Sequence, residues 1–203
     1  MGIAERRERE REEVRRRILD AAHHLFETEG YDRVTMRRIA EAIEYSPTTI
    51  YNHFEDKDDL VEALCHEDFS RLLEAVGEHP APEDPIECIR QFARAYAAFG
   101  LQNPNHYRFM FMTANKFERA HEAAMPGQQA FGLFRAAVAR AVEAGRFRPG
   151  NPDTMAQVLW ASIHGAVALL ITIPDGMWPQ VSAAPDLLEQ VLETGIRGLL
   201  KEE

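Results

Sequence analysis

TMRRIAEAIEYSPTTIYNHFEDK, residues 35–57, is the stretch that decides the fold, and it reads as two short helices joined by a tight turn. Thr35 is suited to cap the first helix, because its hydroxyl can accept a hydrogen bond from a free backbone N–H one turn in. Ser46-Pro47 starts the second helix, with serine as the N-cap and proline at a position that needs no N–H. The apolar positions of the two helices are Ile39, Ala40, Ile43, Ile50 and Phe54.

The other face of the second helix carries short polar groups and one aromatic hydroxyl, with no bulky charge. Its members are Pro47, Thr48, Thr49, Tyr51, Asn52 and His53. Such a face suits a helix laid in the major groove of DNA, with its N-terminal residues at base edges and its dipole toward phosphate. A surface helical hairpin with a polar outer face explains the spacing equally well, since short helical hairpins are common.

A longer match separates these two interpretations. Residues 14–65 resemble the N-terminal domain of the TetR family of transcriptional repressors. The matching segments are ILDAA at 18–22, LF at 25–26, GY at 30–31, TMRRIA at 35–40, SPTTIYNHF at 46–54 and KDDL at 57–60. The resemblance implies a DNA-binding helix-turn-helix, and it is far more specific than any single short motif.

The resemblance also implies a role for individual residues. Arg37 falls where members reach a base edge, and an arginine paired with guanine contributes about 1–3 kcal/mol of discrimination. The base-facing positions of the recognition helix fall on Pro47, Thr48, Thr49 and Asn52. The positions that hold phosphates, and so fix register rather than sequence, fall on Thr35, Tyr51, His53 and Lys57. Asn52 departs from the family, because many members have an aromatic there; its amide can read adenine or bond a phosphate.

Bulk composition limits the class of protein. The chain has 203 residues, of which 45% are hydrophobic, enough for one large or two small domains with a substantial core. Cys65 and Cys88 lie in apolar periodic segments, so we expect buried thiols in a reducing compartment rather than disulfides. No apolar run reaches the roughly 20 residues of a membrane span, and the N-terminal region lacks an apolar signal segment. We therefore expect a cytoplasmic protein with no membrane partner.

Charge is distributed unevenly. The net charge of −10 is unusual for a DNA-binding protein, because phosphate contacts require lysine and arginine. The N-terminal segment is slightly positive, with arginines and glutamates interleaved over residues 5–17. We expect a solvated charged helix or a frayed tail for residues 1–10. Arg15, Arg16 and Arg17 lie near enough to the first helix to approach the backbone of bound DNA.

Apolar residues at helical spacing predict an all-α fold of about nine helices, with no strand pattern. The first helix is expected from about residue 6 to 29, and a long fourth helix from a cap at Asp56 to about residue 78. Proline after a capping residue predicts further starts near residues 84, 103 and 151, a helix is expected over 127–145, and the last is expected from about 185 to 200. Thr113–Met125 is expected to be a loop or short helix. We divide the chain into a three-helix DNA-binding head, residues 1–62, and a ligand-binding and dimerisation body, residues 63–203.

Signals of catalysis are missing from the sequence. There is no glycine-rich phosphate loop, no His-Glu-x-x-His and no cysteine pair at metal spacing. His23 and His24 are adjacent, so they point to different sides of a helix. We expect no enzyme activity, no metal site and no cofactor.

The body has the composition of a sensor. Aromatic, sulfur-containing or titratable residues lie on its inward stripes, namely Phe92, Tyr96, Phe99, Tyr107, Met110, Phe111, Phe131, Phe134, Trp160 and His164. Ordinary core packing explains most of them. Those with a polar atom need a partner if buried, and an apolar pocket with a few such groups is the usual form of a small-molecule site. Residues 160–165, WASIHG, resemble a TetR C-terminal subclass with a Trp-x-x-x-His-Gly signature.

The helix from residue 151 to 173 is apolar over more than half its girth, which predicts burial on two sides, in a core or between subunits. Gly195 and Gly198 suggest a close helix crossing, because each costs about 1 kcal/mol relative to alanine inside a helix. We expect the last two helices to form an isologous four-helix dimer seam. Its predicted residues are Met155, Leu159, Ile163, Val167, Leu188, Val191, Leu192, Gly195 and Leu199.

The sequence therefore predicts a ligand-responsive transcriptional repressor. As a homodimer it would bind a palindromic double-stranded DNA operator, and a small, largely apolar effector would release it. The alternative is a small-molecule-binding or catalytic helical bundle without a DNA role.

Overall fold

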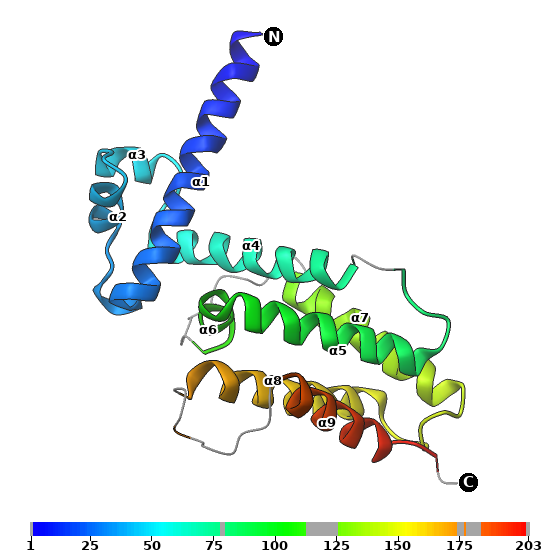
Figure 1. The fold of residues 1–203 in the computed structure, drawn as a ribbon. Helices are drawn as coiled ribbons and strands as arrows, with labels where there is room; N and C mark the ends of the chain where they lie inside the picture. The colour runs from blue at the N-terminus through cyan, green and yellow to red at the C-terminus, as the bar shows by residue number, and fades with distance from the viewer. Residues whose placement is uncertain (1, 78–79, 113–125, 174–176, 178–183, 202–203) are drawn as a thin grey trace. The chain divides into compact units, whose positions relative to one another are not determined.

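The computed structural model describes residues 2–77, 80–112, 126–173, 177 and 184–201. In these residues the chain forms nine α-helices and one short 3-10 helix (Figure 1). The helices are α1 (Ile3–Glu29), η1 (Tyr31–Arg33), α2 (Met36–Ala42), α3 (Pro47–Tyr51), α4 (Lys57–Gly77), α5 (Pro85–Gln102), α6 (Pro104–Met112), α7 (Pro126–Glu143), α8 (Pro152–Thr172) and α9 (Ala184–Arg197). The all-α prediction is confirmed; the expected loop at Thr113–Met125 lies outside the described residues.

Helix starts follow the predicted caps. Five side-chain oxygens accept a backbone N–H within the first turn, those of Thr35, Ser46, Asp56, Asp84 and Asn151. Proline follows directly after Ser46, Asp84 and Asn151, where its lack of an N–H costs no hydrogen bond. Glu87, three residues after the Asp84 cap, directs its carboxylate toward Arg90 and Arg94.

The chain divides into two compact units. One comprises Met1–Asp68 and Phe109–Ala123, and the other comprises Phe69–Arg108 and Ala124–Glu203. In the first unit, α1 packs against η1 and α2, and α2 packs against α3. Its core is built from the apolar positions read from the sequence, including Ile18, Ala22, Leu25, Ile39, Ala40, Ile50, Phe54 and Leu60, all less than 5% exposed. The head boundary at residue 62 remains a proposal.

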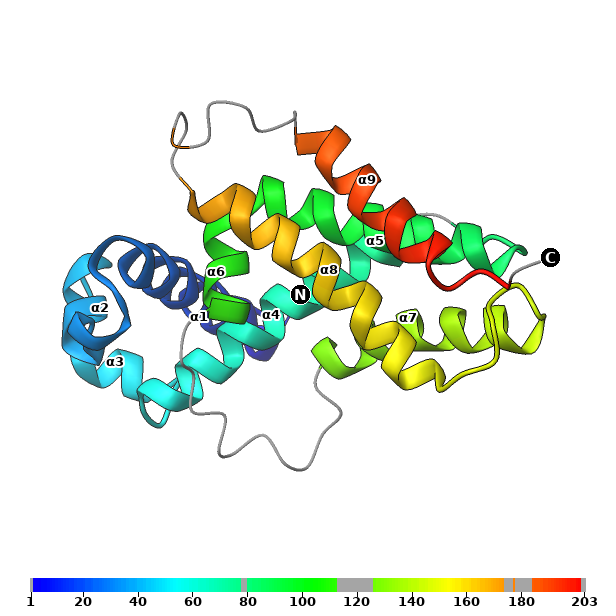
Figure 2. The same ribbon diagram turned by 90° about the horizontal axis from the view of Figure 1, so that it is seen from below.

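In the second unit, α8 packs against α5, α7 and α9, as Figure 2 shows from below. A Cβ added at Gly195 would lie 2.8 Å from Leu159 Cδ2, so α8 and α9 approach closely at this glycine, as expected. The expectation for Gly198 is wrong, because α9 ends at Arg197. The following residues pair with the turn after α7 instead, where Arg148 N donates to Leu199 O.

Most of the predicted dimer-seam residues are buried within the single chain. Met155, Leu159, Ile163, Val167, Leu188, Leu192 and Leu199 are all at most 9% exposed in the single chain, and Val191 and Gly195 are half-buried. They lie in or beside the core of the second unit, because those on α8 and α9 face the neighbouring helices and Leu199, which follows α9, pairs with the turn after α7. Periodicity identified an apolar stripe, but it could not tell a stripe that meets the chain's own helices from one that meets a second copy.

The apolar helix also corrects an expectation about length. By length and composition alone α8 could cross a membrane, whereas no such run was expected. This is weak support for a span, since the core helix of a soluble protein passes the same test. The described part of the chain contains one helix of this kind.

Candidate nucleic-acid interface and buried polar cluster

The outer face of α3 is open to solvent. Thr48 and Asn52 are exposed, and Tyr51 is 54% exposed although it is a large aromatic residue. Ile50 and Phe54, at the intervening positions, are buried and fix this face outward. Thr49 is half-buried, and its hydroxyl lies 2.9 Å from the hydroxyl of Ser46 at the N-cap. The polar side chains predicted to meet base edges therefore share one accessible surface.

Helix α2 carries two adjacent arginines with different roles. The side chain of Arg37 is 81% exposed, and its Nε lies 3.4 Å from Glu41 Oε1. Such an exposed pair contributes little, so the guanidinium can exchange it for another partner. Arg38 instead donates to Glu29 Oε1 at the end of α1, with Nη2 2.7 Å away. The hydroxyl of Thr35 already accepts from Arg38 N, which gives it a structural role as well as its predicted phosphate contact.

Two predicted phosphate ligands are partly buried in the head. His53 has a lowered pKa, chiefly through burial and then through the positive charges of Arg11 and Arg15. The Lys57 ammonium lies 3.7 Å from the centroid of the Tyr31 ring and donates to the Tyr31 carbonyl oxygen. Lys57 thus ties the start of α4 to η1, and a phosphate would have to share its ammonium with these internal partners.

Sequence reasoning missed the aromatic partners of the α1 arginines. The Arg15 guanidinium lies 5.2 Å from the Phe54 ring, and that of Arg17 lies 5.1 Å from the Tyr45 ring. Arg17 Nη1 also donates to the Tyr45 hydroxyl at 3.2 Å. These contacts fix the base of the α1 arginine segment against the helix-turn-helix. The arginines were visible in the sequence, but their partners lie about 30 to 40 residues away in the chain.

The second unit buries a polar cluster made of four residues that the sequence analysis assigns to a ligand pocket. The hydroxyls of Tyr96 and Tyr107 lie 2.8 Å apart, and they lie 3.0 and 2.6 Å from His164 Nδ1. The Trp160 indole N–H bonds the Tyr96 hydroxyl, and its ring stacks on His164 with centroids 5.1 Å apart. Tyr96 and Tyr107 are at most 3% exposed. Three helices, α5, α6 and α8, contribute to this one group.

The cluster is neutral. Burial raises the pKa of both tyrosines and lowers the pKa of His164. A neutral His164 with its proton on Nε2 presents Nδ1 as an acceptor, so the hydroxyls can donate toward it in sequence from Tyr96 through Tyr107. A site with this lining disfavours charged ligands, because they would lose water without gaining an opposite charge.

Other predicted pocket residues form two aromatic pairs. Phe92 and Phe134 have ring centroids 4.9 Å apart, and Phe131 meets Trp160 edge to face at 6.0 Å. Phe99 is buried on the same helix as Phe92 and Tyr96. Met110 and Phe111 belong to the other compact unit. The structure therefore joins Phe131, Trp160, His164, Tyr96 and Tyr107 through direct contacts, with Phe92 and Phe134 as a separate pair.

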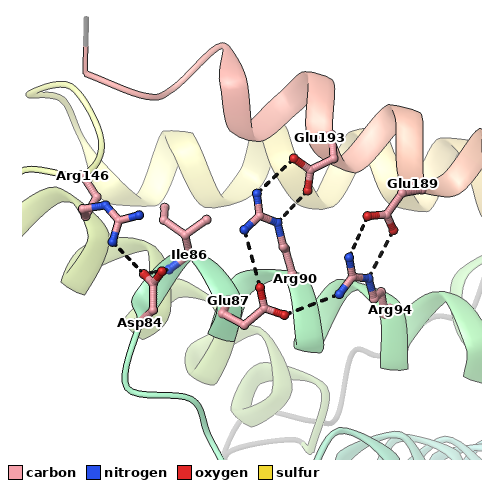
Figure 3. Close-up of polar contacts among 8 residues, drawn as sticks. All are labelled: Asp84, Ile86, Glu87, Arg90, Arg94, Arg146, Glu189 and Glu193. Atoms are coloured by element: carbon pink, nitrogen blue, oxygen red, sulfur yellow. Dashed lines mark hydrogen bonds and ion pairs between the residues drawn. The ribbon is translucent and has the colours of Figure 1, made fainter. Parts of the chain in front are cut away.

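Ion pairs connect α5 to α9 in the second unit (Figure 3). Arg90 and Arg94 each bond a glutamate of α9 through two nitrogen–oxygen contacts, with the shortest at 2.6 Å in both cases. Glu87 contacts both arginines at 3.5 Å, and Arg146 bonds the Asp84 cap at 3.0 Å. No sequence pattern predicted the α5–α9 pairs, because each arginine and its glutamate lie about 100 residues apart in the chain.

The chain combines a helix-turn-helix that has an exposed polar face with a helical unit that buries a neutral cluster. This combination is typical of helix-turn-helix DNA-binding regulators. A family model described as "Bacterial regulatory proteins, tetR family" matches residues 18–64. One described as "Tetracyclin repressor-like, C-terminal domain" matches residues 89–194. The protein belongs to the TetR family of bacterial regulatory proteins, and the family resemblance seen in the sequence is confirmed; the Trp-x-x-x-His-Gly subclass stays a prediction.

Similar proteins agree with this assignment. HTH-type transcriptional repressor Rv1474c of Mycobacterium tuberculosis is 48% identical over 58 residues, which are 29% of this chain and 31% of that protein. HTH-type transcriptional repressor AcnR of Corynebacterium glutamicum is 42% identical over 96 residues, 47% of this chain and 45% of that one. The matched segment thus spans about a third to a half of these relatives.

Solved structures share the fold over nearly the whole chain. A protein of unknown function from Rhodococcus sp. RHA1 has a TM-score of 0.71 at 25% identity, with 93% of this chain and 96% of that chain covered. A TetR family transcription regulator from Marinobacter aquaeolei VT8 has a TM-score of 0.71 at 17% identity, with 97% and 100% covered.

Proposed function

We propose that the protein is a ligand-responsive transcriptional repressor that binds a palindromic operator as a homodimer. The observation that carries the DNA-binding role is the open face of α3, where Thr48 and Asn52 are exposed while Ile50 and Phe54 anchor the helix from behind. A helix held this way can enter a major groove without rearranging its own core. The repressor role is supported by the names of relatives in Mycobacterium and Corynebacterium.

The dimer is supported by the uncovered side of α8. Only 39% of the most apolar stretch of this helix is buried in the single chain. Val158 is 51% and Leu169 is 43% exposed, and Ala161 and Ser162 between them are small and exposed. A Cβ added at Gly165 would meet nothing within 4 Å. We place the seam on this outward stripe, because small residues let two helices approach and the apolar ones gain from leaving water.

The effector class follows from the buried neutral cluster. Tyr96, Tyr107 and His164 can exchange hydrogen bonds with an uncharged polar group, and Trp160 and Phe131 offer aromatic surface. The effector would therefore be a small, largely apolar or aromatic molecule without net charge. It would release DNA only if it binds the DNA-incompetent state more tightly than the competent one.

Gel retardation with DNA upstream of the protein's own gene tests the proposal. Specific retardation should weaken in Arg37→Ala and Asn52→Ala, by about 10-fold or more for a lost bidentate base contact. Arg148→Ala is the matched control, because it removes an exposed charge in the second unit and should leave retardation unchanged. Retardation that is indifferent to both head variants would move the base-reading surface elsewhere. A chain that retards no DNA would favour the ligand-binding bundle without a DNA role.

The effector class has its own test. Naphthol and naphthoate differ mainly in charge, so naphthol should change the fluorescence of the wild-type protein at lower concentration than naphthoate. Trp160→Phe identifies the responding tryptophan, because the change should disappear in that variant. Equal responses to the neutral and the anionic probe would argue against a neutral site.

A further inference from the structure

The N-terminal part of α1 is a single charged helix that continues past the helix-turn-helix (Figure 1). Residues 4–13 are exposed, and they carry four arginines and five glutamates. The sequence favoured a solvated helix or a frayed tail here. The structure shows the solvated helix, because these exposed residues form the first turns of one helix with Ile18, Ala22 and Leu25, which are buried in the head.

Helical continuity fixes where each charge points. Arg7, Arg11 and Arg15 precede Ile18 and Ala22 at steps of three and four residues, so all five lie on one face of α1. Because Ile18 and Ala22 face the core of the head, the three arginines form a row on the same side of the helix. Glu8 and Glu12 border this row, three residues before Arg11 and Arg15, while Glu5, Glu10 and Glu13 lie on other faces.

Contacts in the head confirm the direction of the row at its inner end. Arg15 lies over the ring of Phe54, directly after α3. Besides burial, the positive charges of Arg11 and Arg15 lower the pKa of His53, and Glu12 opposes them with a smaller effect. Two independent observations, helical phase and electrostatic neighbours, therefore place the arginine row beside the residues at the end of α3.

We propose that Arg7, Arg11 and Arg15 form a second DNA-backbone site, which binds phosphates flanking the segment read by α3. This inference rests on the proposed function and extends its footprint. The row is about 12 Å long, because eight residues of α-helix rise about 1.5 Å each. DNA presents one phosphate per strand for about each 3.4 Å of axis, so three guanidinium groups match a short run of phosphates on one strand. Arginine suits this role because its fork bonds phosphate oxygens in pairs.

The row also accounts for how an acidic protein holds DNA. The chain has a net charge of −10, so its overall field repels the duplex. Most glutamates of this segment lie on other faces of α1. The arginine row therefore attracts DNA phosphates locally, on the side where the recognition helix α3 lies. Phosphate contacts of this kind fix register and strengthen binding without reading sequence.

The test compares two charge-matched double variants. Arg7→Gln with Arg11→Gln removes two exposed members of the row and spares Arg15, which packs on Phe54. Arg6→Gln with Arg9→Gln removes two arginines from other faces of the same turns. The probe is a DNA duplex that the wild-type protein selects from a random-sequence library, with long flanking sequences on both sides. Two quantities are measured: the salt dependence of the affinity, and the interference with binding when individual phosphates are ethylated.

The row variant should lower the slope of log affinity against log salt by about 2 per subunit, since each lost phosphate contact removes about 0.9. It should also abolish interference at phosphates outside the α3 site, while the control keeps both. Restoring charge with Arg7→Lys and Arg11→Lys should recover most of the slope. If the salt slope fell equally in the two glutamine variants, or fell in neither, the proposal that the arginine row binds phosphates would be wrong. Wild-type protein that recovers no duplex would overturn the proposed function itself.

Discussion

Arg90 on α5 and Glu193 on α9 form a two-pronged ion pair, with Nε–Oε1 at 2.6 Å and Nη2–Oε2 at 3.0 Å. Their side chains are 27% and 21% exposed, so the pair is partly shielded from water. Arg94 and Glu189 repeat the geometry one turn along, and Glu87 contacts both arginines (Figure 3). These ion pairs restrict the orientation of α9 relative to α5. Apolar packing alone would restrict it less, because apolar contacts are not directional.

Glu193→Gln should destabilise the protein by about 1 kcal/mol at neutral pH, as expected for a charged hydrogen-bonded pair discounted for its exposure. The arginine hydrogen bond holds the pKa of Glu193 below its ordinary value. The stabilisation is therefore present above the unfolded-state pKa and is lost as pH falls through the lower folded-state pKa. Urea unfolding of both proteins at pH 7 and in acid checks this. A difference that persists undiminished in acid would contradict it.

His164 should make the protein less stable in mild acid. Burial lowers its folded-state pKa, so below about pH 6.5 the unfolded chain binds a proton that the folded chain resists. Stability should fall as pH drops below the unfolded value and level off below the folded one. His164→Asn should reduce this loss, measured as the change in melting temperature between pH 7.5 and 5. The other histidines are common to both proteins, and parallel pH profiles would show that His164 contributes nothing.

Two helical glycines should respond oppositely to enlargement. Gly132 on α7 has open space where a Cβ would go, so Gly132→Ala should stabilise by up to about 1 kcal/mol through helix propensity. Gly195→Val should destabilise by about 1–3 kcal/mol, because its Cβ would press on Leu159. Denaturant midpoints measure both effects. The close α8–α9 approach would be in doubt if Gly195→Val were as stable as the wild type.

The revised dimer seam predicts different outcomes for exposed and buried positions. Val158→Asp should yield folded monomers, because Val158 is exposed in the single chain. Leu192→Asp should instead unfold the second unit by placing a charge in its core, where Leu192 is 2% exposed. Light scattering with circular dichroism separates folded monomer from unfolded chain. Dimers of normal mass in Val158→Asp would move the seam off this stripe.

Much of the head was determined by the sequence alone. Short-range signals decide its helices, since a cap such as Thr35 or Ser46 bonds a backbone N–H within three residues. The same local pattern turned Thr48 and Asn52 outward by placing Ile50 and Phe54 on the opposite face. The polar cluster was also visible in part, because Tyr96, Tyr107 and His164 are buried-type helix positions with polar atoms that require partners.

Only the tertiary structure decided which partner each face meets. The apolar stripe of α8 could be predicted from the sequence. Whether Leu159 packs against α9 of its own chain or against a second copy depends on contacts between distant segments of the chain. The Arg90–Glu193 pair and the position of Arg15 on Phe54 are long-range contacts of the same kind. Side-chain periodicity predicts which residues require burial or a charged partner. Many residues of the chain could serve as that partner, and the folded backbone determines which one is close enough to do so.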